Sequence, residues 1–396
     1  MIKFLHTADL HLGKIFHEQS LKDDQNAMLD QLAGLLAGDD YSALIIAGDV
    51  YDRSIPSPEA VELFGSFLGK VKAGKSSPLE IFIIPGNHDS ASRLGFGKEL
   101  FARLGIRFGV SAADCDKPVI LERGGESCAF FLLPFLNPGV LESENPEGNE
   151  PLRSQSALAE EAERRMAKAR QDLRLKGVAR SVLVAHLFAT GSTEAGSERV
   201  FLGNAENVRA DVFRDFDYVA LGHLHRAQRA GEKAWYPGSP LAYSFAEAGQ
   251  EKYFLSVEIS DNGAVVEKIP VAPLRGVTSL TGPFDRFEGD IKDDPELLAS
   301  ANNYLEIRLT DRGITENARD ILRKRFPYLL SLRQDEALSN LAAGSSMRRG
   351  IDTSVRRSIT DDFKNFLLDL YGKDDPEETE LFNNLLAEAE AGEISS

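Results

Sequence analysis

The chain has 396 residues, 42% of them hydrophobic, which is enough for a large core and a smaller module, so we expect two domains and a tail. The first residues lack a charged region followed by an apolar stretch, and no apolar run approaches membrane-spanning length; together these predict a cytoplasmic protein without a membrane partner. The formal net charge of -17 argues against a protein that grips nucleic acid alone, because such affinity comes mainly from Lys and Arg. The two cysteines, Cys115 and Cys128, form no CxxC pair, so neither a disulfide framework nor a structural zinc site is expected.

Short apolar runs alternate with helical patterns through the first half of the chain, as is typical of buried strands in an α/β sheet. The runs cover residues 4–5, 43–47, 81–84, 130–133, 182–185 and 218–221, and helical patterns cover 26–37 and 60–72. Polar side chains follow five of these runs, at Asp9, Asp49, Asn87, His186 and His223. Because ligands of α/β sheets bind beyond the carboxyl ends of the strands, the pattern predicts a single site.

The second half of the chain predicts further strands, a cap and a tail. Runs at 234–236, 253–259 and 264–269 alternate and lack long helices between them, which indicates antiparallel strands that close a second sheet. Segments 277–280, 295–299, 304–309, 315–325 and 329–332 predict a βαβαβ cap. Residues 342–346 read as a linker, and the apolar spacing around Phe363 and Phe382 predicts two amphipathic helices that form a hairpin. The expected fold is α/β, a two-sheet sandwich flanked by helices, with a small α+β cap and a C-terminal helical segment.

Two motifs have the spacing of metal ligands on an extended backbone. In Asp9-Leu10-His11 and His223-Leu224-His225, the i, i+2 spacing sends both polar side chains to one face and the leucine to the other.

Asp49 follows an apolar run and has two carboxylate oxygens, with which it can bridge two cations. Asn87 adds an amide oxygen and His186 a single imidazole, and this donor set suits manganese, iron or zinc. The number of ligands fits two metals, which at about 3.5 to 4 Å apart can drive an in-line phosphoryl displacement.

His88 follows a predicted ligand directly and carries its own imidazole. We interpret it as a catalytic acid or transition-state stabiliser, with Asp89 orienting its ring.

These residues resemble the calcineurin-like metallophosphoesterase superfamily, whose pattern is D-x-H, G-D, G-N-H-[DE], H and G-H-x-H. All five blocks occur here in that order, each after an apolar run. The flanking residues at 4–14, 47–53, 84–89, 218–225 and 238–241 resemble one branch, the bacterial SbcD nuclease subunits, and that resemblance extends over nearly the whole chain.

The resemblance implies a manganese-dependent DNA nuclease with 3'-5' exonuclease action on duplex ends and endonuclease action on single strands and hairpins. It implies an SbcC-type coiled-coil ATPase as partner, and a homodimer within a heterotetramer. The break in the pattern at 270–273 and the linker at 342–346 divide the chain into a metallophosphoesterase domain at 1–273, a capping domain at 274–341, and a linker with partner-docking helices at 342–396. An ATPase that supplies phosphate contacts would reconcile DNA as substrate with the acidic chain.

The family pattern also assigns a role to each predicted site residue. One metal is expected at Asp9, His11, Asp49 and His225, the other at Asp49, Asn87, His186 and His223, with His88 as the catalytic group. Archaeal and eukaryotic relatives carry a histidine three residues after the bridging aspartate, where this chain has Asp52, so a substrate-handling role at that position is not expected.

Two alternatives remain at this point. A phosphoprotein phosphatase, nucleotide phosphatase or nucleotide phosphodiesterase would share the motifs, although such an enzyme does not require a cap and a helical tail. The second alternative is a chiefly structural subunit of the ATPase complex. The complete ligand set argues against it, because an active site that has lost its activity has no physical reason to keep all its metal ligands.

Overall fold

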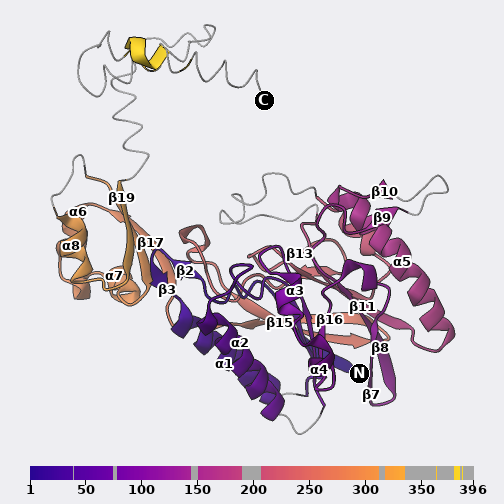
Figure 1. The fold of residues 1–396 in the computed structure, drawn as a ribbon. Coiled ribbons are helices and arrows are strands. Elements are labelled where there is room, and N and C mark those ends of the chain that lie inside the picture. Colours follow the sequence, from indigo (N-terminus) through magenta and orange to yellow (C-terminus); the bar gives the residue numbers. More distant parts are fainter. Residues whose placement is uncertain are drawn as a thin grey trace. The chain divides into compact units, whose positions relative to one another are not determined.

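Two six-stranded sheets organise most of the chain in the computed structural model (Figure 1). The structure describes residues 1–38, 40–74, 78–143, 150–189, 207–311, 317–334, 363, 379–383 and 386. The chain divides into one unit at Met1–Asp335 and a second at Glu336–Ser396. The predicted linker and most of the two C-terminal segments lie outside the described residues.

The first sheet contains, in spatial order, β16 (Gly263–Pro270), β15 (Tyr253–Ser260), β1 (Ile2–Thr7), β4 (Ala43–Ala47), β5 (Glu80–Ile84) and β6 (Ile106–Phe108). The second contains β13 (Gln228–Arg229), β14 (Ala234–Tyr236), β12 (Tyr218–Gly222), β11 (Arg180–His186), β8 (Glu126–Leu133) and β7 (Val119–Arg123). The strands β1, β4, β5 and β6 are parallel to one another, as are β8, β11, β12 and β14.

Helices cover the outer face of each sheet. They are α1 (Lys22–Gly38), α2 (Pro58–Ala73), α3 (Ala91–Leu94), α4 (Lys98–Ala102) and α5 (Gln155–Leu175). The α2 helix begins where Ser57 accepts a hydrogen bond from the Ala60 amide and Pro58 occupies the first turn. Short elements complete this part of the chain: β2 (Ile15–Phe16), β3 (Gln19–Ser20), β9 (Glu142–Ser143), β10 (Glu150–Pro151), and 3-10 turns at Ala112–Asp114, Ala210–Phe213 and Phe245–Glu247.

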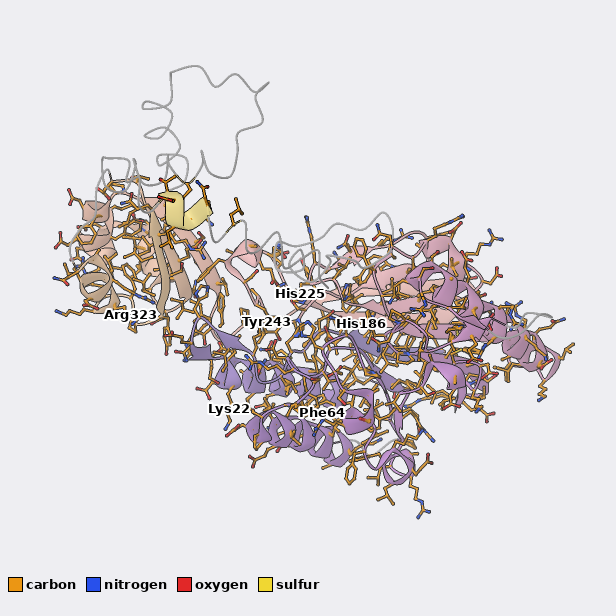
Figure 2. All side chains as sticks on the ribbon, turned by 45° about the horizontal axis from the view of Figure 1, so that its top comes forward. Lys22, Phe64, His186, His225, Tyr243 and Arg323 are labelled. Atoms are coloured by element: carbon orange, nitrogen blue, oxygen red, sulfur yellow. The ribbon has the colours of Figure 1, made fainter. Side chains whose placement is uncertain are left out.

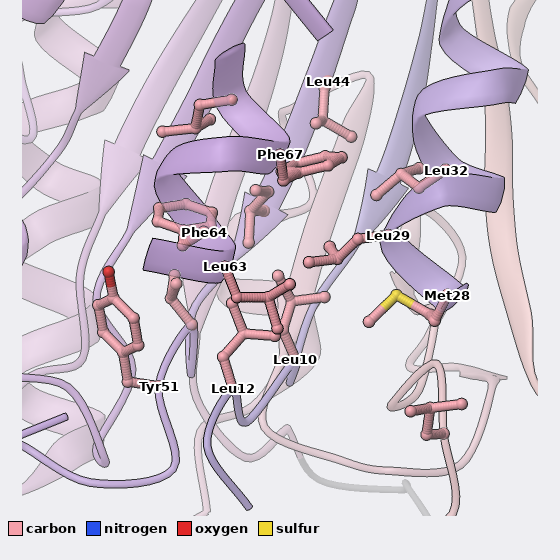
Figure 3. Packing of buried hydrophobic residues seen from close by; sticks show 14 of the residues in the cluster. Leu10, Leu12, Met28, Leu29, Leu32, Leu44, Tyr51, Leu63, Phe64 and Phe67 are labelled. Atoms are coloured by element: carbon pink, nitrogen blue, oxygen red, sulfur yellow. The ribbon is translucent and has the colours of Figure 1, made fainter. Parts of the chain in front are cut away.

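Alternating side chains of the central strands fill three apolar layers. In β4, Leu44 and Ile46 pack under α1 and α2, where Figure 3 shows Phe67 and Leu32 around Leu44. Ala43 and Ile45 point the other way, into the layer shared by the two sheets. A third layer lies between the second sheet and α5. This is the flanked two-sheet sandwich expected from the sequence, and the predicted fold class is confirmed.

One predicted pairing is wrong. The β15–β16 hairpin was expected to close the second sheet, but β15 pairs antiparallel with β1, from Ile2 opposite Ile259 to His6 opposite Leu255. The hairpin therefore extends the first sheet, and β14 joins the second sheet parallel to β12. Alternation along a strand records which side chains are buried, and it carries no information about the neighbouring strand.

The predicted βαβαβ module forms a three-stranded parallel sheet. It comprises β17 (Val277–Gly282), α6 (Phe284–Glu288), a 3-10 turn at Ile291–Asp293, α7 (Pro295–Ser300), β18 (Tyr304–Leu309), α8 (Ala318–Arg323) and β19 (Leu329–Gln334). It has its own apolar cluster, and it contacts α1 through the Tyr304 hydroxyl, which donates to Asp24 Oδ2 at 2.6 Å. The domain boundaries stay a prediction.

In the second unit, the rings of Phe363 and Phe382 stack with centroids 4.0 Å apart. One ring belongs to each of the two predicted amphipathic segments. Among the described helices, none is both long and apolar enough to cross a membrane.

Candidate metal centre

The two sheets touch where β4 and β11 end. His186, the last residue of β11, donates its Nδ1 hydrogen to the Ala47 carbonyl at the end of β4, at 2.8 Å. A Cβ atom on Gly222, at the end of β12, would lie 1.8 Å from that same carbonyl oxygen. Only glycine fits there, and its absence of a side chain lets the polar ends of both sheets share one site.

Four non-glycine residues at these strand ends have positive φ angles: Asp9 (54°), His11 (43°), Asp49 (49°) and His223 (111°). Such conformations cost roughly 1–3 kcal/mol each and cluster at functional sites. Hydrogen bonds hold them in place, since the Asp9 amide donates to the Gly48 carbonyl and the His11 amide to the Asp49 carbonyl, both at 3.0 Å. The folded chain therefore stores strain at this site, as a functional centre does.

Glycines precede Asp49 and Asn87 in the chain because any side chain at these two positions would collide with another residue of the site. A Cβ atom on Gly48 would lie 2.1 Å from His186 Nδ1, and one on Gly86 would lie 2.1 Å from Asp49 Oδ1. The G-D and G-N-H motifs thus have a steric basis.

One side of the centre gathers Asp9, His11 and His225, whose ligand atoms all lie within 4.8 Å of one another. The Nε2 atoms of His11 and His225 are 3.2 Å apart. The His223 amide donates to both carboxylate oxygens of Asp9, at 3.0 and 3.1 Å, which ties the two i, i+2 motifs together.

The other side gathers Asn87, His186 and His223. Asn87 Oδ1 lies 3.1 Å from His186 Nε2 and 3.1 Å from His223 Nδ1. Burial lowers the pKa of His186, so its ring is neutral, and its one hydrogen is on Nδ1. The lone pair of His186 Nε2 therefore faces the amide oxygen of Asn87, and a cation between these two acceptors removes the repulsion. The residues fit a metal on this side.

Asp49 lies between the two sides. Its Oδ2 atom is 3.7 Å from His11 Nε2 and 3.6 Å from His186 Nε2, so one oxygen is nearly equidistant from an imidazole of each side. Burial opposes ionisation of Asp49, but in the acid range, where the His186 and His11 rings take up protons, their charge outweighs burial and lowers the pKa of Asp49 to about 2. The group is a buried anion with one imidazole from each side next to it.

The imidazoles are in the form that binds metals. Burial lowers the pKa of His11 to about 4 and that of His223 to about 3, so both rings are neutral near neutral pH. Neutral imidazole with carboxylate and amide oxygen is a donor set for divalent transition metals.

His88 lies beside this cluster, with its ring centroid 4.8 Å from that of His11. Its amide donates to Asp49 Oδ1 at 2.9 Å, and its Nδ1 hydrogen bonds to the Asp52 carbonyl at 2.9 Å. The expectation that Asp89 orients this ring therefore needs correction, because the Asp52 backbone orients it.

Asp89 instead fastens the loops around the centre. Its carboxylate accepts from the amides of Val50 and Gly86 at 3.0 Å and from the amide of Tyr51 at 2.9 Å. It joins the loop after β5 to the loop after β4, because three backbone amides donate to one carboxylate. Burial and the nearby Asp49 raise the pKa of this carboxyl group to about 7.

Two carboxylates lie behind the centre that the sequence did not predict as site residues. Asp52 Oδ1 is 3.5 Å from His11 Nδ1 and pairs with Lys14 at 2.8 Å. Glu247 Oε1 is 3.3 Å from His225 Nδ1, near Tyr243; Figure 2 labels His225 and Tyr243. The short spacing from Asp49 could have pointed to Asp52, but no motif marks Glu247.

Comparison with known proteins agrees with this geometry. The family model of the calcineurin-like phosphoesterases matches residues 2–227. The chain belongs to this family. It is also 30% identical over 334 residues to the SbcD subunit of the SbcCD nuclease of Staphylococcus epidermidis, covering 84% of this chain and 85% of that protein. The resemblance to SbcD nuclease subunits predicted from the sequence is thereby confirmed.

Two solved structures are among the similar ones. TT1561 of Thermus thermophilus is 14% identical with a TM-score of 0.39, covering 67% of this chain and 98% of its own. The NAD nucleotidase NadN of Haemophilus influenzae is 17% identical with a TM-score of 0.36, covering 87% of this chain and 59% of its own.

Proposed function

We propose that the chain is a manganese-dependent DNA nuclease subunit, a 3'-5' exonuclease on duplex ends and an endonuclease on single strands and hairpins. The observation that carries the proposal is the position of Asp49 Oδ2, which is 3.7 Å from His11 Nε2 and 3.6 Å from His186 Nε2. A buried anion with an imidazole on either side is what a two-metal phosphodiesterase requires.

The residues divide between two metals. Asp9, His11, Asp49 and His225 would hold one, and Asp49, Asn87, His186 and His223 the other. Carboxylate and amide oxygens beside imidazoles suit Mn2+. When bound, such a pair of ions supplies hydroxide near neutral pH and neutralises charge on the phosphate.

His88 would act on the phosphate directly. Because its Nδ1 hydrogen is committed to the Asp52 carbonyl, Nε2 is the ring nitrogen assigned to catalysis. When the ring carries a second proton on Nε2, that nitrogen would donate to the phosphate or pass its proton to the leaving oxygen. The bond from its amide to Asp49 keeps the ring at a fixed place beside the ligands.

The partner in this proposal is an SbcC-type coiled-coil ATPase, with two copies of each chain in a heterotetramer. The similar protein from Staphylococcus epidermidis is named as one subunit of a nuclease complex, which supports this. The net charge of -17 supports it as well, since a second protein would then supply phosphate contacts. The C-terminal amphipathic segments are the proposed docking region.

The test uses labelled linear and hairpin DNA with Mn2+, with and without the ATPase and ATP. We expect Mn2+-dependent cleavage that increases with the partner and disappears in Asp49→Asn. A phosphate monoester assayed in parallel separates the phosphatase alternative, and hydrolysis of the monoester without cleavage of DNA would refute the proposal.

A further inference from the structure

A fully buried carboxylate backs His225. Glu247 has an exposed fraction of 0%, and its Oε1 atom lies 3.3 Å from His225 Nδ1. The same oxygen accepts from the Ser244 hydroxyl at 3.2 Å and the Tyr243 amide at 3.4 Å. With these donors around it, Oε1 is an acceptor, so the His225 hydrogen lies on Nδ1 and its Nε2 lone pair points to the centre.

A buried lysine holds this carboxylate as an anion. Lys252, only 7% exposed, donates to Glu247 Oε2 at 2.5 Å and to Ser239 Oγ at 3.0 Å. Its third bond, also 3.0 Å, goes to the His225 carbonyl. Lys252 therefore neutralises Glu247 and also fixes the backbone of the histidine that Glu247 orients.

The two sides of the centre differ in what lies behind the imidazoles of His225, His11 and His186. On the first side, His225 is backed by Glu247 and His11 by Asp52, both carboxylates. On the second side, His186 Nδ1 donates to a neutral backbone carbonyl, and Asn87 contributes a neutral amide. A carboxylate behind an imidazole makes it a stronger donor to a metal than a carbonyl does.

We propose that Glu247, held by Lys252, is a positioning residue that makes the Asp9, His11 and His225 side bind its divalent metal first and more tightly. The inference rests on the proposed two-metal function and adds an order of binding to it. The second side then fills at higher metal concentration.

The binding order is measured by titrating the metal-free full chain with MnCl2 in a calorimeter. The expected result is two steps for the natural protein. In Glu247→Gln, the tighter step weakens by roughly 10- to 100-fold, the usual effect of losing such an outer partner, while the weaker step stays in place. Asn87→Ala should weaken the second, weaker binding step and leave the tighter step in place.

A matched control tests for a general effect of removing a buried charge. Glu306 is 1% exposed in β18, where it pairs with Arg308 at 2.8 Å. Glu306→Gln should leave both binding steps unchanged.

The position of the His225 hydrogen can be measured on the natural protein, so this test does not depend on whether a variant folds. Nitrogen-15 spectra of the metal-free chain should show the His225 hydrogen on Nδ1. A hydrogen on Nε2, or a Glu247→Gln protein in which both steps weaken equally, would overturn the inference while leaving the proposed function intact. A natural protein that binds no Mn2+ would overturn the proposed function and this inference together.

Discussion

Replacing His6 should remove a pH dependence from the stability of this protein. His6 is fully buried in β1, and its Nδ1 lies 2.9 Å from the Tyr218 hydroxyl. Burial lowers its pKa from 6.5 to about 3. Asparagine at this position keeps an oxygen that can accept from Tyr218 and does not titrate.

The direction of the pH dependence follows from how many protons His6 binds in the folded and in the unfolded state. Below its ordinary pKa, the histidine takes up a proton in the unfolded chain but not in the folded one, so acid stabilises the unfolded state. One pKa unit corresponds to about 1.4 kcal/mol, and the folded pKa lies well below the range of interest. Between about pH 7.5 and 5.5 the natural protein should therefore lose about 1.4 kcal/mol of unfolding free energy at this residue.

The assay is urea unfolding of the natural protein and His6→Asn at both pH values, with a chelator present. Both conditions stay above the sequence pI of about 5.0, where low net charge promotes association. The variant should start less stable, because the core repacks, and its pH dependence should be smaller by about 1.4 kcal/mol.

The same substitution at the exposed His17 provides the control, since it should leave the pH dependence unchanged. If His6→Asn and the natural protein lost equal free energy between the two pH values, the reasoning about burial at His6 would be refuted.

Three further outcomes are expected. His88→Ala should slow Mn2+-dependent DNA cleavage by roughly 10²- to 10⁴-fold in a single-turnover assay while calorimetric Mn2+ binding persists; an unchanged rate would remove the residue from catalysis. Gly48→Ala should displace His186, because the new Cβ atom would lie 2.1 Å from its Nδ1 and the φ angle is +92°, so the weaker Mn2+ step should be lost. Truncation after Gly350 should abolish co-purification with the coiled-coil ATPase and leave both metal steps unchanged, and retained co-purification would contradict the docking role of the tail.

The strands and the predicted metal ligands could be predicted from short stretches of the sequence. The run at 43–47 matches β4, and the polar residue two positions later belongs to the centre, because strand direction and side-chain alternation place it there. The cap was readable for the same reason, since β17, β18 and β19 alternate with helical patterns in the order that parallel sheets require.

The hairpin of β15 and β16 shows that the local sequence pattern predicts a strand but does not predict which sheet the strand joins. Its residues alternate as an antiparallel hairpin should, yet its sheet was predicted wrongly, because the edge of β1 that receives it lies more than two hundred residues away. The role of Asp89 was misjudged for a related reason. Its neighbour in sequence is His88, but its carboxylate bonds to the amides of Val50, Tyr51 and Gly86.

The α/β class, the family resemblance and the residues that meet at the centre could be predicted from the amino-acid sequence, since each depends on short motifs attached to strand ends. The position of Asp49 between two imidazoles, and of Glu247 and Lys252 behind His225, became visible in the folded chain alone. A buried charge is stabilised by whichever groups the folded chain places around it, and no spacing in the sequence records that arrangement.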